Sequence, residues 1–157
     1  MDIKKYLREK NVSFHVGTHV PQYTSQNVAA AEHIGGWELA KVVIVKADGK
    51  PMMTVLQAPK QVDLDRLAAV LSAERVELAE EYELDELFPD CETGAEPPFG
   101  NLYNMPVLVD RELTTKPYIV FQSGSHREAV RISYSDYERI VKPRVADFAV
   151  KAEAMRR

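Results

Sequence analysis

The sequence predicts an α+β fold: a single domain in which helices flank a mixed, largely antiparallel and curved sheet. Two strand-like runs, LAKVVIVKA (39–47) and PMMTVLQA (51–58), are joined by Asp48-Gly49, a pattern typical of a β-hairpin. Strand-like and helix-like segments also alternate without the strict rhythm of a parallel βαβ protein. No repeat, low-complexity tract or Ser/Gly linker divides residues 1–157, so we expect one domain.

The other elements follow from caps, breakers and hydrophobic periodicity. Asp2, Asp63 and Ser133 each precede an apolar or amphipathic segment and are expected to cap a helix. We expect the helices at 3–9, 25–36, 64–73, 80–88 and 134–141. The expected extended segments are 12–20, 75–79, 105–110, 118–122 and 128–133.

Composition excludes several classes of protein. The 157 residues are 45% hydrophobic and carry a net charge of −4, which disfavours an extended basic face for nucleic acid but allows a small local contact. A single cysteine, Cys91, permits neither an intrachain disulfide nor a thiolate metal cluster. The charged N-terminus and the lack of a long apolar run predict a cytoplasmic protein without a membrane span. Phosphate-binding and dinucleotide-binding glycine motifs are missing, and we expect no cofactor.

The stretch ETGAEPPFGN (92–101) is a loop unusually rich in stiff residues. Two prolines fix the backbone and remove donors, while Gly94 and Gly100 allow close backbone approach. Backbone N–H groups held in a fixed direction can stabilise developing negative charge, as in an oxyanion hole. The groups left to do so are those of Gly94, Ala95 and Glu96. Taken alone, however, a Gly/Pro cluster more often only ends one element and starts the next.

Lys41 lies in the first strand of the hairpin. Strand alternation places it in one row with Leu39, Val43 and Val45, so a cation interrupts an apolar face. The side chain either extends along that surface to solvent or faces a cleft, where its charge can hold an anion. The pattern favours neither reading. Lys46 is adjacent to the turn and is expected to be a solvated strand end.

The remaining polar candidates are weaker. Gly124, Ser125 and His126 form a turn with a hydroxyl and an imidazole, yet no Ser/His/Asp arrangement is evident. His15 and His19 have i, i+4 spacing in an extended segment, so no metal site is expected there. Cys91 has no evident base and is interpreted as a structural thiol.

Taken together, these motifs resemble those of the YbaK/prolyl-tRNA-synthetase-associated domain family. The shared pattern is a lysine-bearing strand (LAKVVIV), a Gly-x-x-x-Pro loop (Gly94 to Pro98), a strand ending in Asp110, and a glycine turn at Gly124. The resemblance runs from about the first helix to KPRVADFA, and the order and spacing of the motifs make it fairly specific.

The resemblance implies an aminoacyl-tRNA deacylase that acts in translation fidelity. Such a hydrolase cleaves the ester between a tRNA 3′ end and a wrong small amino acid, such as Ala, Cys, Ser or Thr, in some members on tRNA for proline. It implies a functional role for Lys41 and a substrate-holding role for the loop, and more loosely a role for His126. A ribose hydroxyl of the substrate is implied to help activate water, so no protein base is required. Residues Lys41 and Gly94 are therefore predicted to be catalytic, and the predicted substrate-binding residues are Ala95, Glu96, Pro97, Pro98, Gly124, Ser125 and His126.

Three points stay open at the level of sequence. Many members have threonine after the lysine, where this chain has Val42, but that side chain should point to the opposite face. The expected partners are the acceptor end of an aminoacyl-tRNA and, as a further candidate, a synthetase. A binding module of the same fold without hydrolytic activity, or a hydrolase of small esters, is an alternative function.

Overall fold

The structure, a computed structural model, describes residues 2–18 and 37–151. The helix expected at 25–36 and the expected role of His19 lie outside these residues. Within them, no helix is both long and apolar enough to cross a bilayer.

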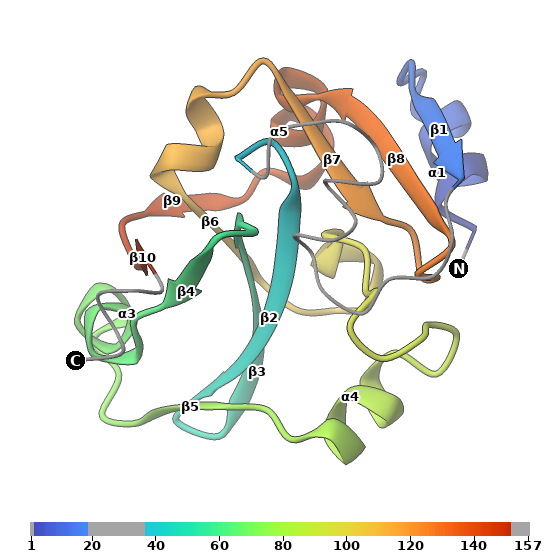
Figure 1. Ribbon diagram of the computed structural model, residues 1–157. Helices are drawn as coiled ribbons and strands as arrows, with labels where there is room; N and C mark the ends of the chain where they lie inside the picture. The colour runs from blue at the N-terminus through green and yellow to red at the C-terminus, as the bar shows by residue number, and fades with distance from the viewer. Residues whose placement is uncertain (1, 19–36, 152–157) are drawn as a thin grey trace.

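The central feature is a mixed sheet with the strand order β5-β2-β3-β6-β9. Strands β2 and β3 form the expected antiparallel hairpin and β5 pairs antiparallel with β2, whereas β3, β6 and β9 run parallel. The bounds of these strands are Ala40–Ala47 (β2), Lys50–Gln57 (β3), Val76–Leu78 (β5), Val107–Asp110 (β6) and Arg144–Ala146 (β9). Figure 1 shows β2 and β3 crossing the middle of the molecule as long curved strands.

Two smaller antiparallel sheets complete the architecture. One has the order β1-β8-β7, with bounds His15–Thr18 (β1), Tyr118–Gln122 (β7) and Glu128–Ser133 (β8). The other pairs β4 (Lys60–Val62) with β10 (Ala149–Lys151). A parallel bridge between Leu39 and Val120 ties the start of β2 to β7. The sheets and the flanking helices confirm the predicted α+β class.

Helices α1, α3 and α5 begin at the caps that the sequence predicted, whereas α4 begins after Glu80, which was not predicted as a cap. Asp2 accepts from the Lys5 N–H, Asp63 from those of Asp65 and Arg66, and Ser133 from that of Asp136. Short 3₁₀ turns occupy two of the loops. The bounds are Ile3–Glu9 (α1), Leu64–Leu71 (α3), Glu81–Leu87 (α4), Tyr134–Val141 (α5), Gly100–Leu102 (η1) and Arg111–Thr115 (η2).

Strand alternation divides the core between the two faces of the central sheet. Ala40 and Ile44 of β2 belong to the larger cluster, which packs against α1, α5, β7 and β8. Val43 and Val45 belong to a smaller cluster with Leu67 of α3. The predicted row is therefore confirmed for Val43 and Val45, and alternation places Lys41 on the same side, whereas Leu39 precedes β2 and belongs to a third cluster with Ala58, Val120 and Ala129.

The C-terminal strands β9 and β10 have no counterpart in the sequence analysis. Each has three residues, too few for a periodic pattern to be visible. A buried carboxylate holds the corner between them: Asp110 Oδ1 accepts from the N–H groups of Phe148 and Ala149, each at 3.1 Å. The sequence marks this Asp only as the end of an apolar strand.

Candidate functional site

Lys41 is the cation at the centre of the candidate site. Strand β2 positions it opposite Leu56 of β3, and its side chain is partly buried. No hydrogen bond or ion pair joins its ammonium to any residue of 2–18 or 37–151. Burial lowers the pKa of Lys41, because desolvation penalises the charged form. Because burial has already removed part of the hydration of this ammonium, an anion that binds here displaces less water from it.

Lys46, on the same strand, provides a contrast. Its ammonium lies 3.1 Å from a Glu83 carboxylate oxygen and 3.7 Å from one of Glu77. The hydrogen bond with Glu83 raises the pKa of Lys46. The lysine next to the turn is thus occupied by acidic neighbours, in addition to lying at the strand end as expected.

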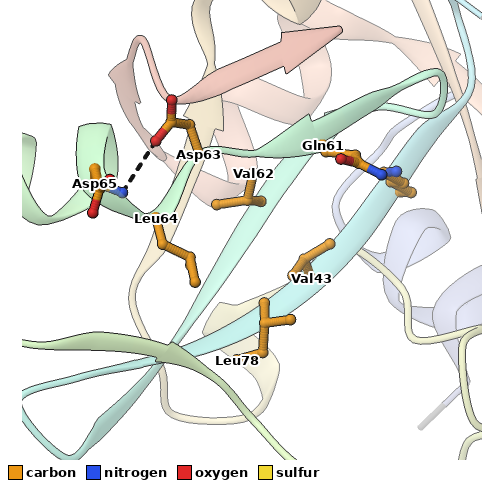
Figure 2. A pocket seen from close by; sticks show the side chains of 8 residues that line it. Val43, Gln61, Val62, Asp63, Leu64, Asp65 and Leu78 are labelled. Carbon is orange, nitrogen blue, oxygen red and sulfur yellow. Dashed lines mark hydrogen bonds between the residues drawn. The ribbon is translucent and has the colours of Figure 1, made fainter. Parts of the chain in front are cut away.

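A cleft of about 580 Å³ opens beside Lys41. In Figure 2 the apolar side chains of Val43, Leu64 and Leu78, from three different elements, point toward one another. Asp63 lies at its margin with its carboxylate engaged by the start of α3. The full lining is Lys41, Val43, Gln61, Val62, Asp63, Leu64, Asp65 and Leu78. This volume is large enough for a small amino acid and part of a nucleoside.

A much smaller hollow lies where Lys41 meets the predicted loop. It measures about 10 Å³, roughly the space of one water molecule and too little for an amino-acid side chain. Its lining is Leu39, Ala40, Lys41, Val42, Gly94, Glu96 and Gln122. Lys41 is the residue common to the two linings, so it lies between the cleft and the loop. The prediction that Lys41 and the Gly94 loop converge is consistent with this placement.

The loop does not present its N–H groups as the sequence suggested. The Gly94 N–H donates to the carboxylate Oε2 of Glu96 at 2.8 Å, and the Ala95 N–H donates to the Glu92 carbonyl at 3.0 Å. The expectation of donors free to bind an oxyanion is therefore corrected, because a buried acidic side chain turns back onto the loop. Glu96 is 6% exposed, and burial raises its pKa.

Hydrogen bonds instead fasten the loop to the glycine turn. The Gly124 N–H donates to the Ala95 carbonyl, the Glu92 N–H donates to the Gly124 carbonyl, and both distances are 2.8 Å. Gly124 has φ +103° and lies against Cys91, so the approach is close. Segments about 30 positions apart in sequence are thereby joined into one unit.

His126 fixes the same junction with its imidazole. Nε2 lies 2.8 Å from the Thr93 carbonyl, which can only accept, so Nε2 carries the proton. Nδ1 then accepts from the Gln122 side-chain amide at 3.3 Å. The ring is 6% exposed and packs against Gly94. These contacts show that His126 holds the loop in place, and its predicted role in substrate binding stays a prediction.

The proline half of the loop belongs to the core. All six residues from 95 to 100 are buried, and the Tyr137 hydroxyl donates to the Pro98 carbonyl at 2.7 Å. Phe99 packs edge-on against Tyr6, Phe121 and Tyr137, with ring centroids 5.3 to 5.8 Å apart. Pro97 and Pro98 thus act through burial and stiffness.

Two further candidates have local roles in the structure. The Ser125 hydroxyl accepts from the Arg127 N–H at 3.0 Å, a bond that closes the turn. Cys91 lies 3.5 Å from the Tyr103 hydroxyl, and burial raises the pKa of its thiol. A raised thiol pKa disfavours the thiolate, in agreement with a structural cysteine. Among the described residues, no group of three or more His, Cys, Asp or Glu side chains is arranged to hold a metal ion.

Comparison with known proteins identifies the family. Residues 19–140 match the family model described as the aminoacyl-tRNA editing domain. The chain belongs to the aminoacyl-tRNA editing domain family. A sequence search of curated proteins gives no match.

Solved structures share the fold of this editing domain at low sequence identity. The crystal structure of a hypothetical protein has a TM-score of 0.85 at 20% identity, covering 94% of this chain and 99% of its own. A protein provisionally described as a trans-editing enzyme for prolyl-tRNA synthetase has a TM-score of 0.81 at 16% identity, with 94% of both chains covered. A protein provisionally described as a signal transduction protein from Marinobacter aquaeolei has a TM-score of 0.75 at 16% identity, covering 95% of this chain and 30% of its own.

Sequence reasoning missed two polar residues that line the candidate site. Gln122 ends β7 and contacts the small hollow, while Gln61 of β4 lines the cleft. A polar residue at the end of an apolar strand was the available signal for Gln122. Gln61 sits in a three-residue strand that was not predicted, so no pattern could have placed it at the cleft.

Proposed function

We propose that the protein hydrolyses the ester bond of mischarged aminoacyl-tRNA, with Lys41 at the reacting end of the substrate. The observation that carries the proposal is a partly buried ammonium, without a partner among the described residues, between a 580 Å³ cleft and a rigid loop. Membership of the aminoacyl-tRNA editing domain family supplies the substrate class.

Lys41 is proposed to stabilise negative charge on the substrate. Two anionic groups are available, the phosphate of the terminal adenosine and the oxygen that develops charge as the ester carbonyl is attacked. Because the N–H groups of Gly94 and Ala95 are engaged within the loop, Lys41 is the stronger candidate for the second role as well. A cation in a partly desolvated position acts on such charge more strongly than one in water.

The loop is proposed to form a fixed wall against which the ester lies. Its contacts to Gly124 and His126 hold Gly94 in place, and its buried proline half prevents it from moving away. A wall that is already ordered adds no conformational cost when the substrate binds. This role replaces that of an oxyanion hole for Gly94 and keeps Ala95, Glu96, Pro97 and Pro98 as its structural support.

The reaction needs only water. The water oxygen attacks the ester carbonyl carbon, the bond from that carbon to the ribose oxygen breaks, and the ribose oxygen takes up the proton. The products are a free amino acid and a tRNA with a free terminal hydroxyl. As the family resemblance implies, a neighbouring ribose hydroxyl assists the water, and no metal or cofactor is required.

The finer features of this function are also proposals. The cleft is proposed to accept small amino acids such as Ala, Cys, Ser or Thr, because its volume must also hold part of the nucleoside. The similarity to a protein provisionally described as a trans-editing enzyme for prolyl-tRNA synthetase makes tRNA for proline the first substrate to test. Action as a free-standing cytoplasmic factor, with a synthetase delivering the tRNA, completes the proposal.

Release of amino acid from a panel of mischarged tRNAs tests this function. We expect the wild type to deacylate at least one of them and Lys41→Ala to lose at least a hundredfold in kcat/KM, about 2.7 kcal/mol of transition-state stabilisation. Lys46→Ala is the matched control on the same strand and should retain activity, since its ammonium is held by Glu83.

Two outcomes would contradict the proposal. Full activity of Lys41→Ala would remove Lys41 from the site, and failure of the wild type on every mischarged tRNA would remove the hydrolytic function. Tight binding of aminoacyl-tRNA without release of amino acid would instead favour the alternative of a binding module. The engaged N–H groups of the loop are the structural observation in favour of that alternative.

A further inference from the structure

A second hollow of about 290 Å³ lies next to the site and combines an exposed aromatic ring with several lysines. Its lining is Trp37, Gln57, Lys60, Glu112, Lys116 and Lys151, and we call it the Trp37 hollow. We propose that the Trp37 hollow binds single-stranded RNA, namely the 3′ end of the tRNA that carries the ester. This inference rests on the proposed function for the identity of its ligand.

Trp37 is a platform on which a base can stack. Its side chain is 43% exposed, although a large aromatic residue is normally buried. The Gln57 side chain is 2% exposed and donates through Nε2 to the Trp37 carbonyl at 3.0 Å, which fixes the backbone just before β2. Proteins that bind single strands use rings presented in this way, because every base has a flat face that can stack on them.

The charges around the ring favour an anionic ligand. Three lysines, Lys60, Lys116 and Lys151, line the hollow. Two carboxylates oppose them: Asp110 lies 3.8 Å from the Lys60 ammonium, and Glu112 belongs to the lining. The local balance is positive on a chain whose net charge is −4. Because the rest of the protein is acidic, a local excess of positive charge directs a polyanion to the Trp37 hollow rather than to other parts of the surface.

The hollow and the cleft at Lys41 are neighbours in the fold. Lys60 and Gln61 are consecutive residues of β4, and the first lines the hollow while the second lines the cleft. Because consecutive side chains of a strand point to opposite faces, the hollow and the cleft flank β4. Gln57 pairs with Ala40, which directly precedes Lys41. Trp37 and Lys41 are four positions apart in the chain, so their Cα atoms are at most about 14 Å apart. A few nucleotides can bridge this distance and bring the terminal ester from the hollow to Lys41.

Binding of a fluorescein-labelled single-stranded RNA with the tRNA 3′ sequence tests the proposal by fluorescence anisotropy. We expect Trp37→Ala to weaken binding by about tenfold to a hundredfold, the loss of one stacked base. The double variant Lys116→Gln, Lys151→Gln should reduce the slope of log K against log salt by about 1.4, or about 0.7 for each lost phosphate contact. Tyr82→Ala, at a ring 59% exposed on α4, and Lys50→Gln, at the hairpin turn, are matched controls and should bind normally.

Kinetics separate this inference from the proposed function. On mischarged tRNA, Trp37→Ala should raise KM, whereas kcat/KM for a minimal aminoacyl-adenosine should match the wild type. Circular dichroism checks the fold of each variant, and Trp37→Leu keeps the apolar bulk without the stacking plane if Trp37→Ala unfolds. If the wild type binds RNA through Trp37 but hydrolyses neither substrate, the result supports RNA binding at the Trp37 hollow and refutes the hydrolytic function.

The inference is overturned by either of two results. In the first, the wild type deacylates tRNA, while the Trp37 variants equal it in RNA affinity and in KM. In the second, an acidic peptide binds at least as tightly as the RNA and with the same dependence on Trp37, which would assign the hollow to a protein partner.

Discussion

Replacement of Gly94 by alanine tests whether the loop serves the site or merely the fold. Gly94 has φ +87°, and an added Cβ would meet only the His126 ring, at an ordinary contact distance of 3.5 Å. The cost to folding is therefore the backbone strain of a left-handed alanine, about 1–2 kcal/mol. For a chain of this size, that corresponds to a fall in Tm of about 2–8 °C.

Gly49 provides a matched control for this strain. It has φ +85° at the β2–β3 turn, and its Cβ would meet nothing within 4 Å. We expect Gly49→Ala and Gly94→Ala to lower Tm by similar amounts, because the backbone strain is the same. Only Gly94→Ala should lower kcat/KM on aminoacyl-tRNA, by about tenfold or more, because a small displacement of a positioned wall is costly to catalysis.

Differential scanning calorimetry and a deacylation assay on the same preparations make the comparison. Equal losses of activity in the two variants, or full activity in Gly94→Ala, would refute a role for Gly94 in the site. A fall in Tm much larger for Gly94→Ala than for Gly49→Ala would also contradict the reasoning, since it would mean that the loop acts mainly through stability.

Two further predictions concern buried carboxylates. Asp110→Ala removes the acceptor of three backbone N–H groups and should lower the free energy of unfolding in urea by about 3–5 kcal/mol. The control Asp147→Ala, at a side chain that is 67% exposed, should change it by less than about 0.5 kcal/mol. Similar effects of the two substitutions would refute the role of Asp110 as a buried anchor. Burial raises the pKa of Glu96, so its contribution to stability is fully present below its unfolded pKa and is lost as pH rises through its folded pKa. Glu96→Gln should therefore be at least as stable as the wild type at neutral pH. In acid, the variant should lack the change of Tm with pH that protonation of Glu96 causes in the wild type. The same dependence of Tm on pH in both proteins would contradict the burial of a charged Glu96.

Local sequence signals were sufficient wherever the determining contacts are local. Asp48-Gly49 fixes the hairpin, because both residues take the positive φ that its turn requires. The caps at Asp2 and Asp63 are made within the next three residues of the chain. By contrast, the three-residue strand β9 pairs with β6 some 36 positions away, and nothing local marks it.

The loop at 92–101 shows most clearly which features the sequence predicts and which depend on the tertiary structure. Its stiffness follows from its glycines and prolines and was predicted, whereas the direction of its N–H groups was not. That direction depends on the Glu96 carboxylate turning back onto Gly94 and on the Gly124 turn docking from about 30 residues away. In both cases the sequence offers other hydrogen-bond partners for the same N–H groups, and nothing local in the chain selects the one that the fold uses.

The sequence by itself determined the α+β class, the hairpin, the helix starts and the placement of Lys41 in an apolar row, because each depends on backbone propensity and on alternation along one strand. Only the tertiary structure decided that Lys41 lies between a cleft and a small hollow, that the Gly94 and Ala95 N–H groups are engaged within the loop, and that Trp37 and three lysines line a neighbouring hollow. These features depend on burial and on hydrogen bonds between distant segments, which exist only once the chain has packed.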